Sequence, residues 1–275
     1  MMSRDLTDCD FRRFSRLVHE ESGIHLHEGK KELVRARLGK RLRETGSKDF
    51  KAYWRFLTND ESGEELVWML DVISTNQTSF FREEKHFDFL REKVLPSYME
   101  GHGRSRKFRF WSAGCSSGEE AYSLAIVLLE YFGARASLYM KILATDISTN
   151  VLAKAKTGIY PGNRVSNIPQ VALRKYFQMG YGKQEGNFRV KRVLRDITEF
   201  RRFNLMDPFL FREVFNVIFC RNVMIYFHRR TQQELINKFH ESLFHGGYLF
   251  IGHSETLTGI DHSFRYVMPG VYQKQ

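Results

Sequence analysis

Cysteine is scarce in this chain of 275 residues. The three cysteines, Cys9, Cys115 and Cys220, lie far apart, and no two of them form a CxxC pair. This pattern excludes a disulfide framework and a thiolate zinc site, and it is typical of a reducing compartment. The ten histidines, His253 among them, show no spacing typical of metal ligands, so the sequence predicts no metal site.

Long hydrophobic runs are also missing. No apolar run approaches the roughly 18 residues that a membrane-spanning helix needs, and residues 1–10 are polar with mixed charge, unlike a signal peptide. The sequence therefore predicts a soluble, cytoplasmic protein. Its apolar fraction of 42% and aromatic fraction of 14% allow a sizeable core, and its length fits one large domain or a main domain with a small one.

Acidic residues are in deficit, because 43 Lys and Arg face 32 Asp and Glu and give a net charge of +11. Residues 1–72 contain 14 of each kind, so the remainder of the chain carries the whole excess. Within it, residues 158–202 hold ten basic residues and three acidic ones. Such an excess attracts nucleic acid, anionic lipid or an acidic protein surface, and charge alone does not choose among them.

Hydrophobic periodicity divides the chain into parts. Residues 1–72 show helical spacing of their apolar positions and predict a small helical N-terminal domain. The polar stretch TNQTSFF lies in a predicted linker, residues 73–86, and a helix is expected at 83–98. Residues 87–275 form the predicted main domain, in which strands at 108–111, 139–144, 199–203, 214–219 and 247–252 alternate with helices at 119–132, 148–157 and 230–244.

This alternation predicts a mostly parallel, doubly wound α/β sheet. Residues 158–197 interrupt it and are expected to form an inserted subdomain. That subdomain should contain a short helical piece at 171–177 and a β-hairpin in GYGKQEGNFRVKRVL (180–194), with glycine at its turns.

The stretch FRFWSAGCSSGEEAYSLAIVLL (108–129) has the order of strand, glycine-containing loop and helix that a nucleotide-type cofactor needs. Gly114 and Gly118 allow a tight turn and close approach of a ligand. The dinucleotide fingerprint GxGxxG is absent, and Glu119 and Glu120 at the helix entrance would repel a pyrophosphate. A cofactor with a sulfonium and an amino group tolerates these carboxylates, which favours S-adenosylmethionine over NAD.

Asp146 follows the second predicted strand at the distance expected within one βαβ unit. A carboxylate there accepts both ribose hydroxyls of an adenosyl cofactor. Two alternatives remain open at this point. Asp146 is also suited to cap the helix beginning near Ser148, and Glu119 is also a favourable first-turn residue for the helix dipole.

Six motifs occur in order along the chain: TNQTSFFRE (75–83), WSAGCSSGEEAYS (111–123), ATDIS (144–148), FNL (203–205), FCRNVMIYF (219–227) and GHSE (252–255). Together they closely resemble the CheR family, the chemotaxis receptor methyltransferases that esterify glutamate side chains. The resemblance extends over nearly the whole chain. It implies a small helical N-terminal domain followed by a Rossmann-like class I methyltransferase domain with a small inserted β-subdomain.

The resemblance also implies S-adenosylmethionine as cofactor, S-adenosylhomocysteine as product and receptor glutamates as substrate. The cofactor contacts of the family fall on Asn76, Thr78, Arg82, Glu119, Asp146, Asn204, Leu205, Arg221 and Asn222, to which the loop analysis adds Gly114. Glu119 and its neighbour Glu120 are hard to tell apart by position alone.

The chemistry of carboxylate methylation sets the catalytic expectations. A glutamate has a reference pKa of about 4.3 and is ionised at neutral pH, so no general base is needed. Positioning and exclusion of water matter instead. Arg82 and Arg221 are the predicted holders of the substrate carboxylate, and Tyr226 is predicted to orient the substrate, with an ordinary half-buried aromatic as its alternative.

A basic helix is expected to meet the receptor. Seven basic residues lie within positions 30–43, including the predicted receptor contacts Lys30, Arg35, Arg37, Lys40 and Arg41. A solvated helix face is the common explanation of such a run, but the family would use it to contact glutamate-rich receptor helices. Some family members grip a receptor tail with the inserted hairpin by strand addition, which implies Gly186 and Arg189 here.

A monomer without nucleic acid or inserted membrane segment is expected. Two other functions remain as alternatives. An RNA methyltransferase would suit the basic surface, although the sequence has no NPPY-type motif, Arg/Gly-rich tail or aromatic stacking platform. A non-catalytic sensor of S-adenosylmethionine would use the same fold.

Overall fold

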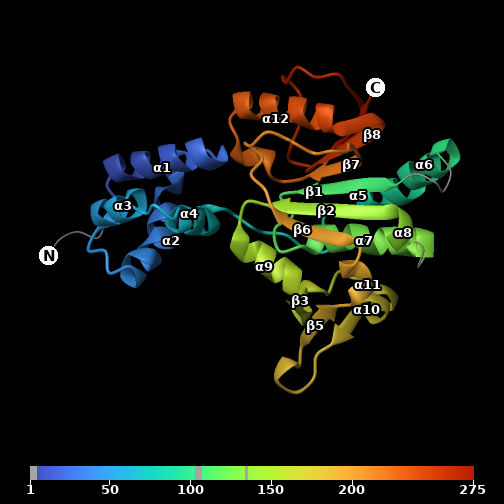
Figure 1. The fold of residues 1–275 in the computed structure, drawn as a ribbon, viewed down its shortest axis with the longest axis horizontal. Helices are drawn as coiled ribbons and strands as arrows, with labels where there is room; N and C mark the ends of the chain where they lie inside the picture. Colours follow the sequence, from blue (N-terminus) through green and yellow to red (C-terminus); the bar gives the residue numbers. More distant parts are fainter. Residues whose placement is uncertain (1–4, 103–106, 134–135) are drawn as a thin grey trace.

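The computed structural model describes residues 5–102, 107–133 and 136–275, and it begins with a group of helices (Figure 1). These are α1 (Asp8–Ser22), the 3₁₀ helix η1 (Glu28–Lys30), α2 (Lys31–Glu44), α3 (Phe50–Thr58) and α4 (Glu64–Ile73). The Thr7 hydroxyl caps α1 by accepting the N–H of Asp10, and Gly23 ends the helix with a φ of 72°. Apolar faces of these helices meet around Phe14 and Tyr53.

A seven-stranded sheet forms the body of the protein, in the order β6-β2-β1-β7-β8-β10-β9. Its strands are β1 (Phe108–Ala113), β2 (Met140–Asp146), β6 (Thr198–Arg202), β7 (Phe215–Cys220), β8 (Leu243–Ile251), β9 (Phe264–Met268) and β10 (Val271–Lys274). The strands from β6 to β8 pair in parallel. The predicted α/β fold with a helical N-terminal part is confirmed.

The end of the sheet differs from the sequence prediction, which placed no strand after residue 252. There, β10 pairs antiparallel with both β8 and β9. These two strands are short, and neither is followed by a helix, so the alternation of strands and helices gave no signal for them.

Helices cover both faces of the sheet. On one face lie α7 (Glu119–Phe132) and α9 (Thr149–Thr157), and on the other lies α12 (Arg229–Ser242) (Figure 1). Alternate residues of β7 therefore enter different cores. Val217 and Phe219 pack with α7, whereas Ile218 and Cys220 pack with α12.

The helix predicted at 83–98 is a continuous helical segment in three pieces: α5 (Glu84–Phe89), the π-helical η2 (Leu90–Val94) and α6 (Leu95–His102). A short helix, α8 (Ala136–Tyr139), precedes β2. Within the described residues, no helix has both the length and the apolar character needed to cross a membrane.

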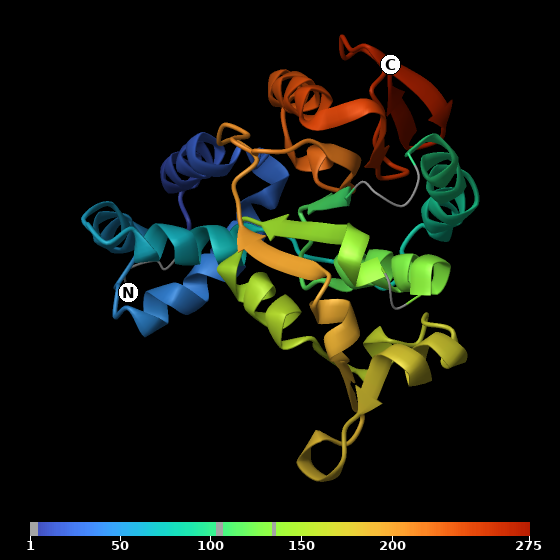
Figure 2. The same cartoon turned by 45° about the vertical axis from the view of Figure 1, so that its right-hand side comes forward.

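The inserted subdomain contains its own three-stranded sheet and projects from the body beside α9 (Figures 1 and 2). The strands β3 (Ile159–Pro161), β4 (Phe177–Met179) and β5 (Asn187–Val190) have the order β3-β5-β4, with 3₁₀ turns at Gly162–Arg164 (η5) and Gly182–Gln184 (η6). Two short helices, α10 (Gln170–Tyr176) and α11 (Arg192–Arg195), flank them.

The hairpin predicted within residues 180–194 is therefore wrong in its extent. Its first strand is β4, which ends at Met179, and its second is β5. The residues after β5 turn into α11 instead of continuing the strand. The second strand of the hairpin was predicted correctly, because Phe188 and Val190 alternate with polar residues. The basic residues that follow it show no helical pattern, so α11 was not predicted.

The N-terminal helices dock against the carboxyl ends of the parallel strands. The N–H of His25 donates to the carbonyl of Tyr226 at 2.7 Å, and Ile24 forms a bridge with Phe227. On a second element, Asp71 accepts hydrogen bonds from the N–H and hydroxyl of Thr149, both at 2.7 Å. These bonds place the helical part over the edge of the sheet where ligands of such folds bind.

Candidate functional site

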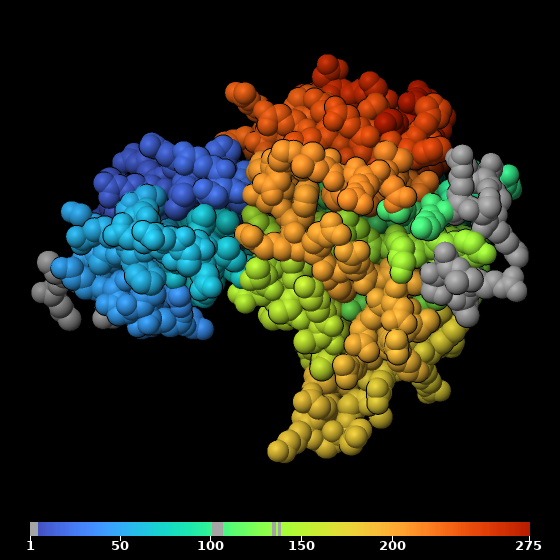
Figure 3. Space-filling view, in the orientation of Figure 1, coloured from blue at the N-terminus to red at the C-terminus, as the bar shows by residue number. Residues whose placement is uncertain are grey.

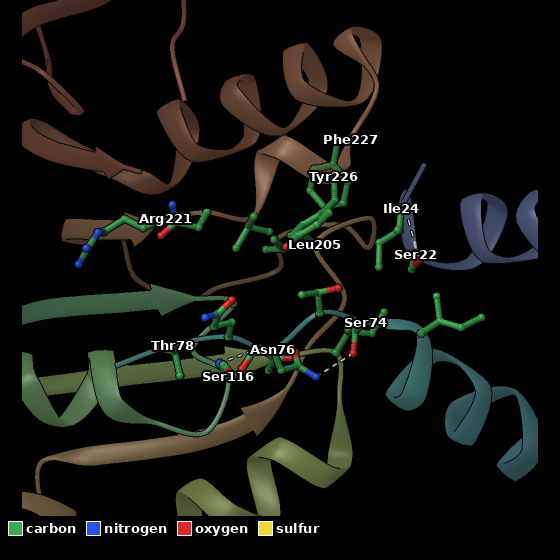
Figure 4. A pocket seen from close by; sticks show the side chains of 18 of the residues that line it. Ser22, Ile24, Ser74, Asn76, Thr78, Ser116, Leu205, Arg221, Tyr226 and Phe227 are labelled. Carbon is green, nitrogen blue, oxygen red and sulfur yellow. Dashed lines mark hydrogen bonds between the residues drawn. The ribbon is translucent and has the colours of Figure 1, made fainter. Parts of the chain in front are cut away.

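The carboxyl ends of β1, β2 and β7 open into a cavity that the N-terminal helices close from the other side (Figure 4). Its empty space, counted to its open mouth, is about 1240 Å³. Three stretches line it: residues 22–33, residues 73–82 and the loops that follow the strands. Ten of the predicted cofactor and catalytic residues lie here: Asn76, Thr78, Arg82, Gly114, Asp146, Asn204, Leu205, Arg221, Asn222 and Tyr226.

Strained backbone is concentrated in the segments around this cavity. Among the described residues, the non-glycine residues with positive φ are Phe81 (52°), Glu83 (57°), Ser116 (49°) and Asn222 (59°). They belong to the linker, to the loop after β1 and to the loop after β7. Such conformations are costly and persist where the surroundings hold them, which is common at functional sites.

The linker between α4 and α5 runs along the cavity as irregular backbone. Asn76 donates from its amide to the Ser74 hydroxyl at 3.0 Å, and its own carbonyl accepts the Ser116 hydroxyl at 3.0 Å. Arg82 donates to the carbonyl of Gln77 at 3.0 Å. These bonds fix the linker against the loop after β1, so that its polar side chains become part of the wall (Figure 4).

Asp146 ends β2 with its carboxylate facing both neighbouring loops. One oxygen accepts the N–H of Ser116 at 2.8 Å, and the other accepts the N–H of Ser148 at 2.9 Å. The alternative in which Asp146 caps the following helix is wrong, because the side chain of Ser148 occupies that role toward Val151. Burial raises the pKa of the Asp146 carboxyl, against the effect of these hydrogen bonds.

No residue other than glycine fits at position 114. Its φ is 81°, and a Cβ atom there would lie 2.5 Å from a methyl carbon of Val223. The loop after β1 therefore passes close to the loop after β7, and only glycine permits that approach.

The structure corrects the choice between the two glutamates at the start of α7. Glu119 lies outside the cavity and fully buried, with its carboxylate accepting from Ser117 at 2.6 Å and from Arg164 at 2.7 Å. Glu120 lines the cavity and accepts the Ser112 hydroxyl at 2.6 Å. Consecutive helical residues point about 100° apart, so only one of them faces the sheet edge. Burial raises the pKa of the Glu120 carboxyl.

The two predicted arginines differ in how far they are engaged. Arg221 is only 2% exposed at its side chain and contacts the carboxylates of Glu83 at 3.3 Å and Glu120 at 3.4 Å. It also donates to the backbone carbonyl of Arg82. In Figure 4 its side chain extends away from Tyr226. Arg82 is partly exposed, and its guanidinium donates to a backbone carbonyl, that of Gln77. Of the two arginines, it is the better placed to meet a ligand carboxylate.

The carboxylate of Glu255, in the loop after β8, holds the loop after β7 in place. Glu255 accepts the backbone N–H groups of Asn222 at 2.9 Å, Gly252 at 2.6 Å and Ile225 at 3.2 Å. Burial raises the pKa of Glu255, while these hydrogen bonds act to lower it. The sequence prediction did not include this residue, although the motif GHSE was its visible signal.

Asn204 and Tyr226 both line the cavity and connect the main domain to the N-terminal helices. Asn204 lines it and donates from its side-chain amide to the carbonyl of Glu21 at 2.6 Å, which ties the loop after β6 to α1. Leu205 and Tyr226 lie close together on the wall nearest α1 (Figure 4). Tyr226 is partly buried, and its backbone carbonyl holds His25.

The predicted receptor-contact residues of the first domain separate into two groups. Arg37 and Arg41 are partly buried and donate hydrogen bonds within the protein. Arg37 donates to the carbonyls of Ile73 and Ser74, and Arg41 forms a bidentate pair with the buried carboxylate of Glu65. These bonds engage the two guanidinium groups within the protein, so their contact with a receptor stays a prediction. Helical spacing alone does not distinguish a fully exposed arginine from one that reaches a buried acceptor.

The other predicted receptor residues are accessible. The side chain of Lys40 is 72% exposed and that of Arg35 is 47% exposed. Lys30 lines the cavity itself. In the inserted subdomain, Arg189 is exposed on β5, and Gly186, with a φ of 80°, precedes that strand.

Two family models match the chain. The model described as the CheR methyltransferase all-alpha domain matches residues 10–74, and the one described as the CheR methyltransferase SAM-binding domain matches residues 76–272.

Curated relatives match over nearly the full length. A chemotaxis protein methyltransferase of Borreliella burgdorferi is 44% identical, over 98% of this chain and 95% of the relative. One of Escherichia coli is 38% identical, over 94% of this chain and 88% of the relative. The chemotaxis protein methyltransferase Cher2 of Pseudomonas putida is 34% identical, over 96% and 97%.

Proposed function

The chain belongs to the CheR methyltransferase family, and we propose that its methyltransferase reaction forms methyl esters on glutamate side chains of chemotaxis receptors. Its cofactor is S-adenosylmethionine, since residues 76–272 carry the SAM-binding domain of the family. The observation that carries the proposal is the charge of the cavity. Carboxylates of Glu120 and Asp146 lie at the sheet, whereas the cations Lys30 and Arg82 come from the helical part and the linker.

The residues present fit a phosphate-free adenosyl cofactor. Asp146 lies on the cavity wall, and two backbone N–H groups, one on each oxygen, fix its carboxylate there. The remaining lone pairs are available to accept ribose hydroxyls. Glu120 offers an acceptor for an amino group at the start of α7. When bound, S-adenosylmethionine supplies an electrophilic methyl group, and these side chains hold it without a phosphate-binding loop.

The substrate side of the reaction needs orientation more than proton transfer. An ionised glutamate already carries the nucleophilic oxygen, so a cation must guide it without neutralising it. Arg82 and Lys30 are the cations of the wall that suit this role. Tyr226 lies on the same wall and is proposed to orient the incoming side chain, while Arg221 holds Glu83 and Glu120 in place.

An acidic receptor surface is proposed to dock on the exposed face of α2. Arg35, Lys40 and Arg43 are exposed there. In Figure 3 the N-terminal helices and the inserted subdomain flank a hollow in the surface, which offers a concave seat for receptor helices. Complementary charge across such a contact mainly speeds encounter and sets orientation. The family matches and the relatives named above lend no support to RNA methylation.

The domain division is part of this proposal. Residues 1–72 would recognise the receptor, residues 73–86 would complete the cofactor site, and residues 87–275, with the insertion 158–197, would carry the reaction. The protein is proposed to act as a monomer in the cytoplasm.

Transfer of a radiolabelled methyl group to receptor-containing membranes tests the function. Label on the receptor that is released by alkali is expected, because a glutamyl methyl ester hydrolyses in base. Alkali-stable label, or label found in added RNA instead, would contradict the proposal. Asp146→Ala serves as the inactive control.

The docking face is tested by reversing charge. Arg35→Glu with Lys40→Glu should lower receptor methylation and leave S-adenosylhomocysteine affinity unchanged. Lys51→Glu with Arg55→Glu makes the same charge change at exposed positions of α3. An equal loss in both double variants would mean that net charge, and not a contact on α2, governs the encounter.

A further inference from the structure

Beside the cavity, three potential metal ligands come together from distant parts of the chain. Glu83 precedes α5, His86 lies within that helix, and His253 follows β8. One ligand atom from each lies within 4.8 Å of the other two. The backbone N–H of His253 also donates to Glu83 at 3.1 Å, which fixes the two segments together.

The surroundings of His86 determine which ring nitrogen carries the proton. The imidazole is fully buried, and its Nε2 atom lies 3.2 Å from the carbonyl oxygen of Pro269. A carbonyl only accepts, so Nε2 is the protonated nitrogen of the neutral ring. Gly270 makes this approach possible, because a Cβ there would lie 2.8 Å from Nε2.

The other nitrogen, Nδ1, then presents a lone pair with no hydrogen-bond donor. It is buried and makes no hydrogen bond in the structure. It faces the Oε2 atom of Glu83 at 3.4 Å. A lone pair opposite a carboxylate oxygen is repulsive unless a positive charge lies between them.

We propose that Glu83, His86 and His253 bind a divalent transition metal ion, for which Zn²⁺ is the probe. Two imidazoles and one carboxylate are a donor set that such ions take. The bond from His86 to the Pro269 carbonyl is the outer interaction that ligating histidines usually make, and it orients the free nitrogen toward the site. This site departs from the sequence prediction of no metal, because its ligands are brought together only by the fold.

The distances are close to those of a metal shell. Zinc bonds to nitrogen are about 2.0–2.1 Å, so two ligand atoms of a tetrahedral site lie roughly 3.4 Å apart. His86 Nδ1 already stands at that distance from Glu83 Oε2. His253 Nε2 stands at 3.9 Å from the same oxygen, and its side chain is 44% exposed, so a small rotation brings it in. Solvent on that side gives the ion an entry path.

The charges nearby both oppose and favour a cation. Arg221 lies 3.3 Å from Glu83, and its positive charge repels a metal ion bound there. The same guanidinium, however, also contacts the carboxylate of Glu120 at 3.4 Å. Two carboxylates therefore share one arginine, and a net negative charge remains for the ion to neutralise.

Metal binding and the Glu83–Arg221 pair use the same carboxylate oxygen. An ion on Oε2 weakens the hold of Glu83 on Arg221, whose side chain lines the cofactor cavity. Zinc and S-adenosylhomocysteine should therefore alter each other's affinity, and this coupling is reciprocal by thermodynamic necessity.

The test is zinc binding by the full chain, prepared without a polyhistidine tag and measured by competition with a chromophoric chelator. The unaltered protein is expected to take up one equivalent of Zn²⁺. His253→Ala should weaken that binding at least tenfold, and because the side chain is partly exposed, this variant should still fold. His245→Ala, at an exposed position away from the cluster, should bind as the unaltered protein does.

Co²⁺ provides a second readout, since its visible absorption reports imidazole coordination directly. A spectrum that is lost in His253→Ala and retained in His245→Ala supports the site. No uptake by the unaltered protein overturns the proposal, as does uptake that His253→Ala leaves unchanged. Failure of receptor methylation would not affect either outcome, so the metal site and the proposed function are tested separately.

Discussion

Glu255→Gln tests whether the loop after β7 depends on one carboxylate. The Oε2 atom of Glu255 accepts the N–H groups of Gly252 and Asn222, and Oε1 accepts that of Ile225. Glutamine has a single acceptor oxygen. If that oxygen keeps the bonds of Oε2, the new amide group points its own hydrogens at the N–H of Ile225, and two donors face each other.

The expected loss follows from these bonds. An N–H left without an acceptor costs about 1–3 kcal/mol, and the two retained bonds lose roughly half their strength when the charge is removed. One effect opposes this loss, because burial raises the pKa of Glu255 and the neutral amide avoids the cost of burying a charge. We therefore expect the free energy of unfolding to fall by about 2 kcal/mol.

Two measurements check this expectation. Urea unfolding gives the free energy, and calorimetry with S-adenosylhomocysteine should show roughly tenfold weaker binding, which corresponds to about 1.4 kcal/mol. The cofactor effect is expected because Asn222 and Tyr226, held by this loop, line the cavity. Glu241→Gln, at an exposed position of α12, is the control. Unchanged stability and unchanged affinity in Glu255→Gln would refute the reasoning.

Asp146→Ala should weaken S-adenosylhomocysteine binding by an order of magnitude or more, because the acceptor proposed for the ribose disappears; unchanged affinity by calorimetry would remove that role. Glu120→Gln should weaken the same binding, whereas Glu119→Gln should mainly lower stability by disturbing the pair with Arg164, and the reverse order would restore the original choice of Glu119. Arg41→Ala should lower the free energy of unfolding by about 3 kcal/mol, since it removes the cation beside the buried carboxylate of Glu65, while the exposed neighbour variant Lys40→Ala should change it by less than about 0.5 kcal/mol in urea titrations.

The sequence was most informative where periodicity and motif agreed. The helix predicted at 119–132 coincides with α7, and each of the five predicted strands corresponds to a strand of the main sheet. Buried parallel strands are continuous apolar runs separated by amphipathic helices, so both periods were visible. The polar loops at the strand ends then located most of the cavity wall.

Residues whose role depends on facing direction were harder to predict. Glu119 and Glu120 are adjacent, and only the packing of α7 decides which one meets the cavity. Arg37 and Arg41 share the basic character of Lys40, but their acceptors lie 24 residues or more away in the chain. Such partners belong to tertiary structure, and no spacing within one helix reveals them.

The antiparallel end of the sheet illustrates a different limit. The strands β9 and β10 pair with each other across a short turn at Gly270, with a φ of 75°. Only Phe264, Val271 and Tyr272 are buried in these two strands, so neither a long buried run nor a clear alternation marks them. Their stability comes from the neighbour β8, which a local pattern does not contain.

The cavity wall is shared between two parts of the chain, because residues 22–33 and the strand-end loops both line it. A ligand bound there contacts both parts and links them. The part of its binding free energy that comes from contacts with the N-terminal helices is lost when the two parts separate. Ligand binding therefore stabilises the docked arrangement of the two parts. Residues 73–82 of the linker also line this cavity. A bound ligand should therefore protect residues 73–82 from proteolysis. Limited digestion with and without S-adenosylhomocysteine would measure this protection.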